Sequence, residues 1–218
     1  MRNPRWLKPA AHALLALPML LLAARWALLL SGDATAAGLG AEPVAATINA
    51  LGIWALRILL LALAVTPLRT LTGWTPIMSL RRAIGLWAFA YACMHMALFL
   101  GLDLAWSLTA LWQEVVKRRY ILFGMAALIA LLPLAITSTS GWVKRLGARR
   151  WRNLHRLAYA AGLLASIHFL LRVKGFQIEP WIYASIFAAL MLLRLRFITS
   201  RVSLRGWPNR PARRSESR

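Results

Sequence analysis

Long apolar stretches alternate with short, mostly basic connections along this chain. The apolar runs cover residues 10–30, 48–65, 83–102, 120–136, 157–171 and 181–195. A helix that crosses the roughly 30 Å hydrocarbon core of a bilayer needs about 17–25 residues. The first, third and fourth runs reach that length themselves, and the other three reach it when their flanks are included. The pattern predicts an all-α integral membrane protein, a bundle of six transmembrane helices.

The runs divide the chain into three segments. Residues 1–9 form a short N-terminus, residues 10–198 the six-span domain, and residues 199–218 a tail rich in Arg, Pro and Ser that we expect to be disordered. A cleaved signal peptide ending near Ala34-Thr35-Ala36 is the alternative for the first run. That run is long for a signal peptide and contains His12 and Arg25, so a retained membrane helix is favoured.

Lysine and arginine fall mainly on one side of the six predicted spans. That side receives the N-terminus, the 66–82 connection, the strongly basic segment 144–156 and the C-terminal tail, whereas residues 31–47 on the other side contain no Lys or Arg. Cytoplasmic loops of membrane proteins carry this excess of positive charge. We therefore predict a multi-pass membrane protein with both termini in the cytoplasm.

Composition narrows the function classes. Of 218 residues 60% are hydrophobic and 15% are charged, and 27 Lys and Arg against 6 Asp and Glu give a formal charge of +21. Nucleic-acid binding is disfavoured, because the basic residues lie between apolar runs rather than on one polar surface. Membrane lipid is the expected surrounding. With a single cysteine, Cys93, the chain can form no internal disulfide and no Cys-ligated zinc or iron–sulfur site.

His95 and His168 lie at matching depths in two predicted spans. With a rise of 1.5 Å per residue, they lie about 18 Å and 22 Å from the cytoplasmic ends of their helices. Ionisable side chains inside a bilayer are usually functional. Two imidazoles at one depth can ligate one iron from opposite faces, so the pair predicts a bis-histidine b haem and an electron-transfer role.

The other two histidines lie near the cytoplasmic surface. His155 precedes His168 by thirteen residues on what reads as the same helix, about 20 Å lower and about 140° around the helix axis. His12 has a similar depth in the first span, so a second haem between His12 and His155 is an alternative that would need a bent helix. Hydrogen bonding to neighbours explains His12 equally well, and an interfacial position explains His155.

Arg57 is the other costly residue inside a predicted span, about ten residues from the periplasmic start of the second run. A charged side chain in lipid needs a partner or a route to the surface. A haem propionate at the depth of His95 and His168 would provide the first, and lipid phosphate the second.

Several short stretches resemble the MsrQ (YedZ) family. They are Leu39-Gly40-Ala41-Glu42-Pro43, Thr66-Pro67-Leu68, Arg81-Arg82-Ala83-Ile84-Gly85-Leu86-Trp87, Tyr120-Ile121-Leu122-Phe123-Gly124, Thr137-Ser138-Thr139, Leu146-Gly147-Ala148-Arg149-Arg150-Trp151, Leu154-His155, Ile167-His168 and Val173-Lys174. Each stretch is weak alone, but their order and the histidine positions are specific, and the resemblance covers residues 10–198. One departure is Arg118-Arg119-Tyr120, where the family often has Arg-Pro before the aromatic residue.

The resemblance implies a ferric-reductase-like cytochrome b domain that carries haem b and uses FMN, with His95, His155 and His168 as haem ligands. It implies a periplasmic molybdopterin partner, MsrP, that reduces methionine sulfoxide in oxidised proteins, and quinol or a cytoplasmic flavin reductase as electron donor. Such a chain is an electron-transfer subunit rather than a catalytic one. A stand-alone transmembrane ferric reductase and a proton-coupled transporter with a histidine relay are the rival hypotheses.

Overall fold

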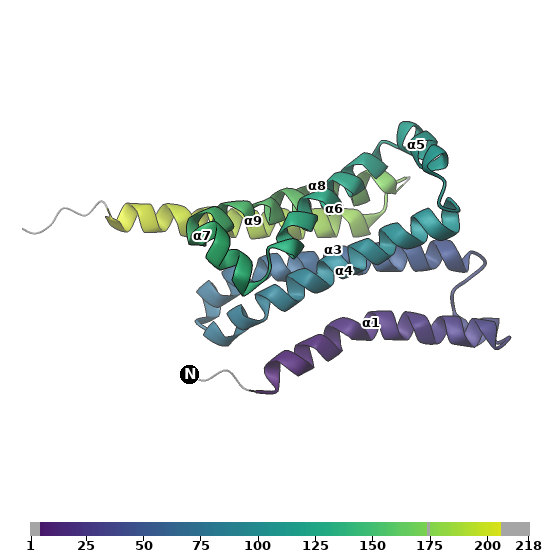
Figure 1. Ribbon diagram of the computed structural model, residues 1–218, viewed down its shortest axis with the longest axis horizontal. Coiled ribbons are helices and arrows are strands. Elements are labelled where there is room, and N and C mark those ends of the chain that lie inside the picture. Colours follow the sequence, from purple (N-terminus) through teal and green to yellow (C-terminus); the bar gives the residue numbers. More distant parts are fainter. Residues whose placement is uncertain (1–4, 174, 206–218) are drawn as a thin grey trace, which may run out of the picture.

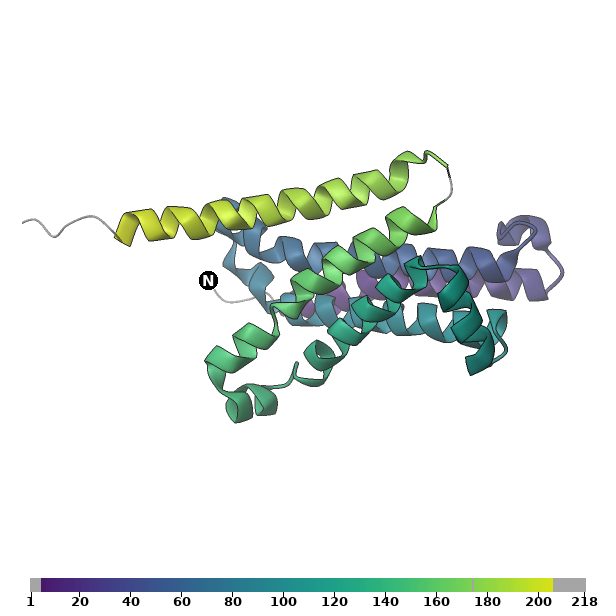
Figure 2. The same ribbon diagram turned by 90° about the horizontal axis from the view of Figure 1, so that it is seen from above.

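The computed structural model describes residues 5–173 and 175–205, and this part of the chain is helical with no β-strand. The long helices run roughly along one axis (Figures 1 and 2). In chain order the elements are α1 (Leu7–Leu30), α2 (Ala34–Ala37), α3 (Pro43–Thr72), the 3-10 segment η1 (Thr75–Ser79), α4 (Arg81–Leu98), the π-helical segment η2 (Phe99–Asp103), α5 (Leu108–Lys117), α6 (Tyr120–Ile136), α7 (Ser140–Leu154), α8 (Leu157–Arg172) and α9 (Ile178–Arg205).

The predicted fold class is confirmed, with a qualification for two spans. Within the described residues, α1, α3, α4 with η2, and α9 as far as Leu195 are long and apolar enough to cross a bilayer. Helices α6 and α8 have only 17 and 16 residues. They pass the same test only together with α5 and α7, which meet them at 118° and 40°. The described residues thus contain four helices that could each cross a bilayer, or up to six spans when each bent pair counts as one.

Helices α5 and α7 are absent from the sequence prediction, which treated both segments as connections. Each begins at a hydroxyl cap that accepts a backbone N–H of the first turn: Ser107 from Ala110 at 3.1 Å, and Thr139 from Trp142 at 3.3 Å. Both helices mix apolar and polar residues, and α7 is kinked at Gly147, where φ is +74°. A search for long apolar runs does not find α5, because it is short, or α7, because it is rich in charged residues.

The break between α7 and α8 corrects the prediction for His155. The sequence placed His155 and His168 on one continuous helix, but α7 ends at Leu154 and α8 begins at Leu157. His155 therefore lies at a turn, and the predicted angle of about 140° between the two imidazoles does not apply. Helix α9 also continues to Arg205, beyond residue 198, where the disordered tail was expected to begin. Residues 1–4 and 206–218 lie outside the described part of the chain.

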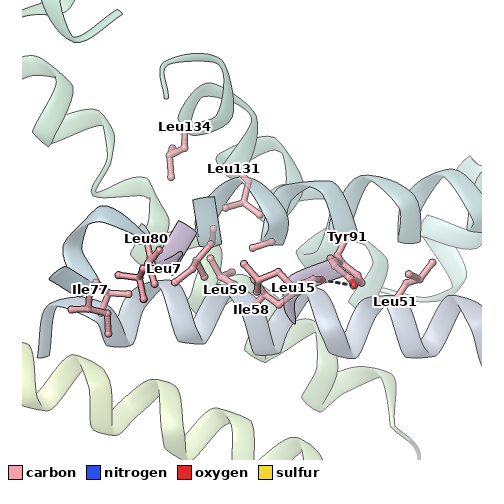
Figure 3. Close-up of a cluster of buried hydrophobic side chains, with 14 residues drawn as sticks. Leu7, Leu15, Leu51, Ile58, Leu59, Ile77, Leu80, Tyr91, Leu131 and Leu134 are labelled. Atoms are coloured by element: carbon pink, nitrogen blue, oxygen red, sulfur yellow. Dashed lines mark hydrogen bonds between the residues drawn. The ribbon is translucent and has the colours of Figure 1, made fainter. Parts of the chain in front are cut away.

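Helix α3 forms the centre of the bundle, with ten buried residues. In a membrane, helices associate through close packing rather than hydrophobic transfer, so small residues matter at their contacts. Ala88 of α4 and Ala161 of α8 are 1% and 0% exposed, and both belong to the cluster drawn in Figure 3. This packing fixes α4 and α8, the helices that carry His95 and His168.

Helix α1 is held to the bundle by polar contacts. Tyr91 of α4 is buried, and its hydroxyl donates to the Leu15 carbonyl at 2.9 Å (Figure 3). The same hydroxyl accepts the Met19 N–H at 3.1 Å. In a regular helix these two backbone groups would bond to each other. Pro18 lies inside α1 between these two residues, and a proline inside a helix disturbs the preceding turn. The Tyr91 hydroxyl thus satisfies both backbone groups beside Pro18.

We expect Tyr91→Phe to destabilise the docking of α1, because it leaves two backbone groups without their partner in a site that water does not reach. The cost should be about 1–3 kcal/mol of unfolding free energy. Thermal unfolding in detergent measures the effect, with Tyr159→Phe as the control, since the Tyr159 ring faces Arg194 at 4.5 Å and remains in the variant. Equal stability of the two variants would show that the Met19 N–H and the Leu15 carbonyl bond to each other within α1 and do not need the Tyr91 hydroxyl.

Candidate functional site

His95 of α4 and His168 of α8 come together, as the sequence predicts. Their ring centres are 6.3 Å apart and their planes cross at 82°. Both line a cavity of about 330 Å³ between α3, α4, α6 and α8, whose lining is largely apolar. The two histidines, which are 73 residues apart in the chain, therefore face the same cavity.

Backbone carbonyls orient both imidazoles. His95 Nδ1 lies 2.7 Å from the Ile48 carbonyl oxygen, and His168 Nδ1 lies 2.7 Å from the Tyr120 carbonyl oxygen. A carbonyl oxygen only accepts, so each Nδ1 carries the hydrogen and donates it. Each Nε2 is then left with a free lone pair, which is the arrangement of a metal-ligating histidine whose other nitrogen is fixed by a hydrogen bond.

Two glycines, Gly52 and Gly124, provide the space for these rings. A Cβ at Gly52 of α3 would lie 3.0 Å from His95 Cε1 and Nδ1, and a Cβ at Gly124 of α6 would lie 2.7 Å from His168 Nδ1. Any other residue would force the imidazoles to move. Neither glycine was predicted as a site residue, although Gly124 lies in one of the family-like stretches. Each glycine follows by four residues the residue whose carbonyl accepts from the histidine: Gly52 follows Ile48, and Gly124 follows Tyr120.

The two histidines fit a metal that is already held by a ligand of its own, such as a macrocycle. No cluster of three or more His, Cys, Asp or Glu that could hold a metal ion occurs in the described part of the chain. Two imidazoles alone suit an iron already held in a macrocycle. The two imidazoles, with ring centres 6.3 Å apart in the cavity, are the residues that would hold such a group.

Polar side chains gather at one end of the cavity. Arg172 donates to the Asn49 amide oxygen, and Arg118 pairs with Glu114 at 2.8 Å. Asn49, Asp103, Arg118, Tyr120 and Arg172 line this end, which we call the polar rim. It lies on the side of the bundle opposite the N-terminus, because α3 and α6 begin there and α8 ends there. Arg118 and Arg172 were not predicted from the sequence as site residues.

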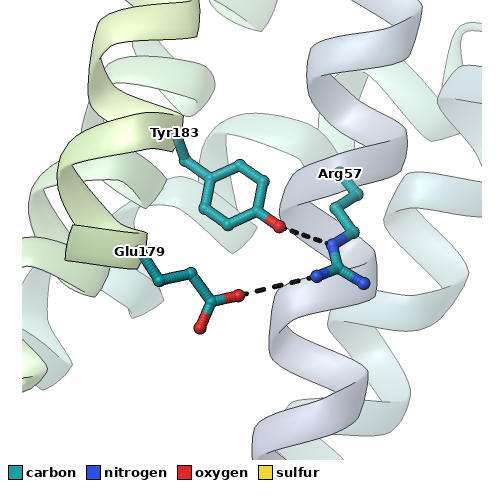
Figure 4. A network of polar contacts seen from close by, with 3 residues as sticks. All are labelled: Arg57, Glu179 and Tyr183. Atoms are coloured by element: carbon teal, nitrogen blue, oxygen red, sulfur yellow. Dashed lines mark hydrogen bonds and ion pairs between the residues drawn. The ribbon is translucent and has the colours of Figure 1, made fainter. Parts of the chain in front are cut away.

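Arg57 is directed toward helix α9, where it meets Glu179 and Tyr183 (Figure 4). Its Nε donates to the Tyr183 hydroxyl at 2.6 Å, and its NH2 group lies 3.5 Å from Glu179 Oε1, both on α9. The guanidinium also lies 4.9 Å from the Trp54 ring centre. Arg57 is not among the residues that line the cavity. The partner expected in a haem propionate is supplied here by a protein carboxylate, so a propionate contact of Arg57 stays a prediction.

His155 and His12 make other contacts and do not line the cavity. The Thr137 hydroxyl donates to the Pro133 carbonyl at 2.6 Å, so His155 Nε2, 3.2 Å away, donates to Thr137. The His155 ring also stacks on Trp151 at 3.8 Å. His12 Nδ1 accepts the Trp87 indole N–H at 2.9 Å. Their nitrogens are thus engaged differently from those of His95 and His168, and a haem ligated by His155 or His12 stays a prediction.

Comparison with known proteins agrees with this geometry. Residues 51–167 match the family model described as "Ferric reductase like transmembrane component". The chain therefore contains a ferric-reductase-like transmembrane domain, which includes His95, and His168 directly follows the matched residues.

Individual relatives narrow the class. The chain is similar to the Xanthomonas oryzae pv. oryzae protein named "Protein-methionine-sulfoxide reductase heme-binding subunit MsrQ", with 43% identity over 97% of this chain and 90% of that protein. It is also similar to the protein of the same name from Rhodospirillum rubrum, with 49% identity over 72% of this chain and 76% of that protein. The chain belongs to the MsrQ family, as its sequence motifs indicated.

Proposed function

We propose that this chain is the haem b-binding membrane subunit of a methionine sulfoxide reductase system and carries electrons across the inner membrane to a periplasmic molybdopterin reductase of the MsrP type. The single observation that carries the proposal is the pair His95 and His168, with both Nδ1 atoms hydrogen-bonded to carbonyls and the rings 6.3 Å apart in one cavity. The relatives' name, which specifies a haem-binding subunit, supports it.

Each part of the site has a task in this function. His95 and His168 would hold the haem iron, because the hydrogen bonds from Nδ1 to the Ile48 and Tyr120 carbonyls leave each Nε2 free to bind it. A bound haem supplies the one-electron redox chemistry. The apolar lining limits water, and Arg172 at the polar rim, which bonds the uncharged Asn49 amide, would pair with a propionate carboxylate.

The donor and the flavin are further parts of the proposal. Electrons would enter from quinol or from a cytoplasmic flavin reductase, and FMN is expected from the family resemblance. The basic segment 144–156, which forms most of α7, is a surface that suits the phosphate of FMN, because Lys144, Arg145, Arg149 and Arg150 are exposed there. Positive charge in a cytoplasmic segment also serves topology, so this assignment depends on the flavin titration below.

A reduced-minus-oxidised absorbance spectrum of the purified protein tests the proposal directly. We expect the bands of a low-spin b haem, and then electron transfer from the reduced protein to an oxidised MsrP-type partner. Addition of FMN should give a saturable change in flavin fluorescence. A stand-alone ferric reductase, the second candidate raised by the family model, would instead reduce an Fe(III) chelate and leave the partner oxidised. A protein without any haem band would contradict both.

We expect Arg172→Leu to lower the midpoint potential, because a positive charge at the polar rim favours the reduced haem, whose iron–porphyrin core carries one positive charge less. At roughly 10 Å and an effective dielectric constant of about 20, the loss is about 1–2 kcal/mol. Arg57→Leu is the matched control, since Arg57 faces Glu179 outside the cavity. A redox titration in which the Arg57 variant shifts more than the Arg172 variant would return the propionate role to Arg57.

A further inference from the structure

The two histidines sit in half-sites built to the same plan. In one, His95 of α4 donates to the carbonyl of Ile48 on α3 and faces Gly52, four residues further along α3. In the other, His168 of α8 donates to the carbonyl of Tyr120 on α6 and faces Gly124, four residues further along α6. The histidine follows its carbonyl by 47 residues in the first half-site and by 48 in the second.

This plan fixes each ring in two ways. The carbonyl lies on the neighbouring helix and holds Nδ1 at 2.7 Å, which sets the direction in which the imidazole edge points. The glycine removes the Cβ that would meet the ring at 3.0 Å in one half-site and 2.7 Å in the other. A ring held by one edge and packed directly against a helix backbone cannot rotate freely about its Cβ–Cγ bond. The observed angle of 82° between the two planes is therefore set by the protein.

We infer that Gly52 and Gly124, together with the Ile48 and Tyr120 carbonyls, are positioning residues that hold the two axial imidazoles of this protein in crossed planes. The inference rests on the proposed haem function and deepens it. Axial-ligand geometry is one of the levers by which a protein tunes haem iron. Crossed imidazole planes leave two iron d orbitals of a low-spin ferric haem nearly equal in energy, and this gives a strongly anisotropic EPR signal. Parallel planes give an ordinary rhombic signal.

The experiment is EPR spectroscopy of the oxidised, haem-loaded full-length protein, with haem content measured in the same samples. The parent should show the strongly anisotropic signal. In Gly124→Ala the added methyl group would lie 2.7 Å from His168 Nδ1, so the largest g value should fall and haem content should decrease. Gly52→Ala should act in the same direction but less, because its closest contact is 3.0 Å.

Two matched glycines separate ring position from helix packing. Gly85 lies on α4 with His95, and a Cβ there would meet nothing within 4 Å, so Gly85→Ala should leave the spectrum unchanged. Gly162 lies on α8 with His168, and a Cβ there would meet the Phe187 ring at 2.8 Å. Gly162→Ala should lower thermal stability and still keep the parent's EPR signal.

The outcomes are distinct. A rhombic parent signal typical of parallel planes would overturn the inference and leave haem ligation intact. Unchanged signals at full haem content in both Gly52→Ala and Gly124→Ala would also overturn it. Complete haem loss from Gly124→Ala would support it if Gly162→Ala retains haem, and would oppose it if Gly162→Ala loses haem equally. Absence of any low-spin haem in the parent would be a failure of the proposed function itself.

Discussion

Replacement of His95 or His168 by alanine is expected to remove nearly all haem absorbance, while the protein still inserts into the membrane. Each variant removes one of the two imidazoles that face the cavity, and the described chain offers no third histidine there. A haem held by one remaining ligand in an apolar cavity is bound weakly and is lost on purification. Soret absorbance per mole of purified protein measures the effect, and detection of the protein in the membrane fraction verifies insertion.

His12→Ala and His155→Ala are the matched controls for this prediction. His12 contacts Trp87, and His155 contacts Thr137 and Trp151, so neither change touches the cavity. Both variants should keep the haem of the His95–His168 site. A second haem, if His155 ligates one, would appear as a fall in the haem-to-protein ratio of His155→Ala from two to one. Parental absorbance in both His95→Ala and His168→Ala would sink the ligand assignment.

The helix content and the histidine pair could be predicted from the sequence because the bilayer acts as a strong external constraint. Every apolar run had to be a helix with its backbone groups paired internally. A constant rise per residue then placed His95 and His168 at one depth without any knowledge of packing. The structure brings their ring centres to 6.3 Å from each other, although α4 packs mainly against α3 and α8 mainly against α6 rather than α4 and α8 against each other.

Side-chain partners could not be predicted in the same way. Arg57 bonds to Tyr183, which is 126 residues away in the chain, and which residue of α9 reaches Arg57 depends on the rotation of α9 about its own axis. Gly52 and Gly124 have no polar atom and no charge, so only a measured approach of 2.7–3.0 Å to a histidine ring shows what they do. The break before α8 was hidden for a related reason, because residues 153–156 contain neither glycine nor proline to mark a turn.

Charge distribution leads to the last prediction, which concerns the sidedness of the protein. All five acidic residues of the described chain lie at the end of the bundle that carries the polar rim: Asp33, Glu42, Asp103, Glu114 and Glu179. The opposite end has the basic helix α7 and the starts of α1 and α4. Because positively charged segments stay in the cytoplasm, we propose that the polar rim faces the periplasm.

Cysteine labelling tests this sidedness with an all-or-none result. In a Cys93→Ala background, Thr35→Cys marks the rim end and Ser140→Cys marks the α7 end, and both positions are exposed. A membrane-impermeant maleimide applied to intact cells should label Thr35→Cys fully, and should label Ser140→Cys only after lysis. The result bears on the direction of electron transfer, because the His95–His168 cavity has its polar rim at the same end as Thr35. Labelling in the reverse order would place that rim in the cytoplasm, and delivery of electrons to a periplasmic reductase would then have to leave from the other end of the bundle.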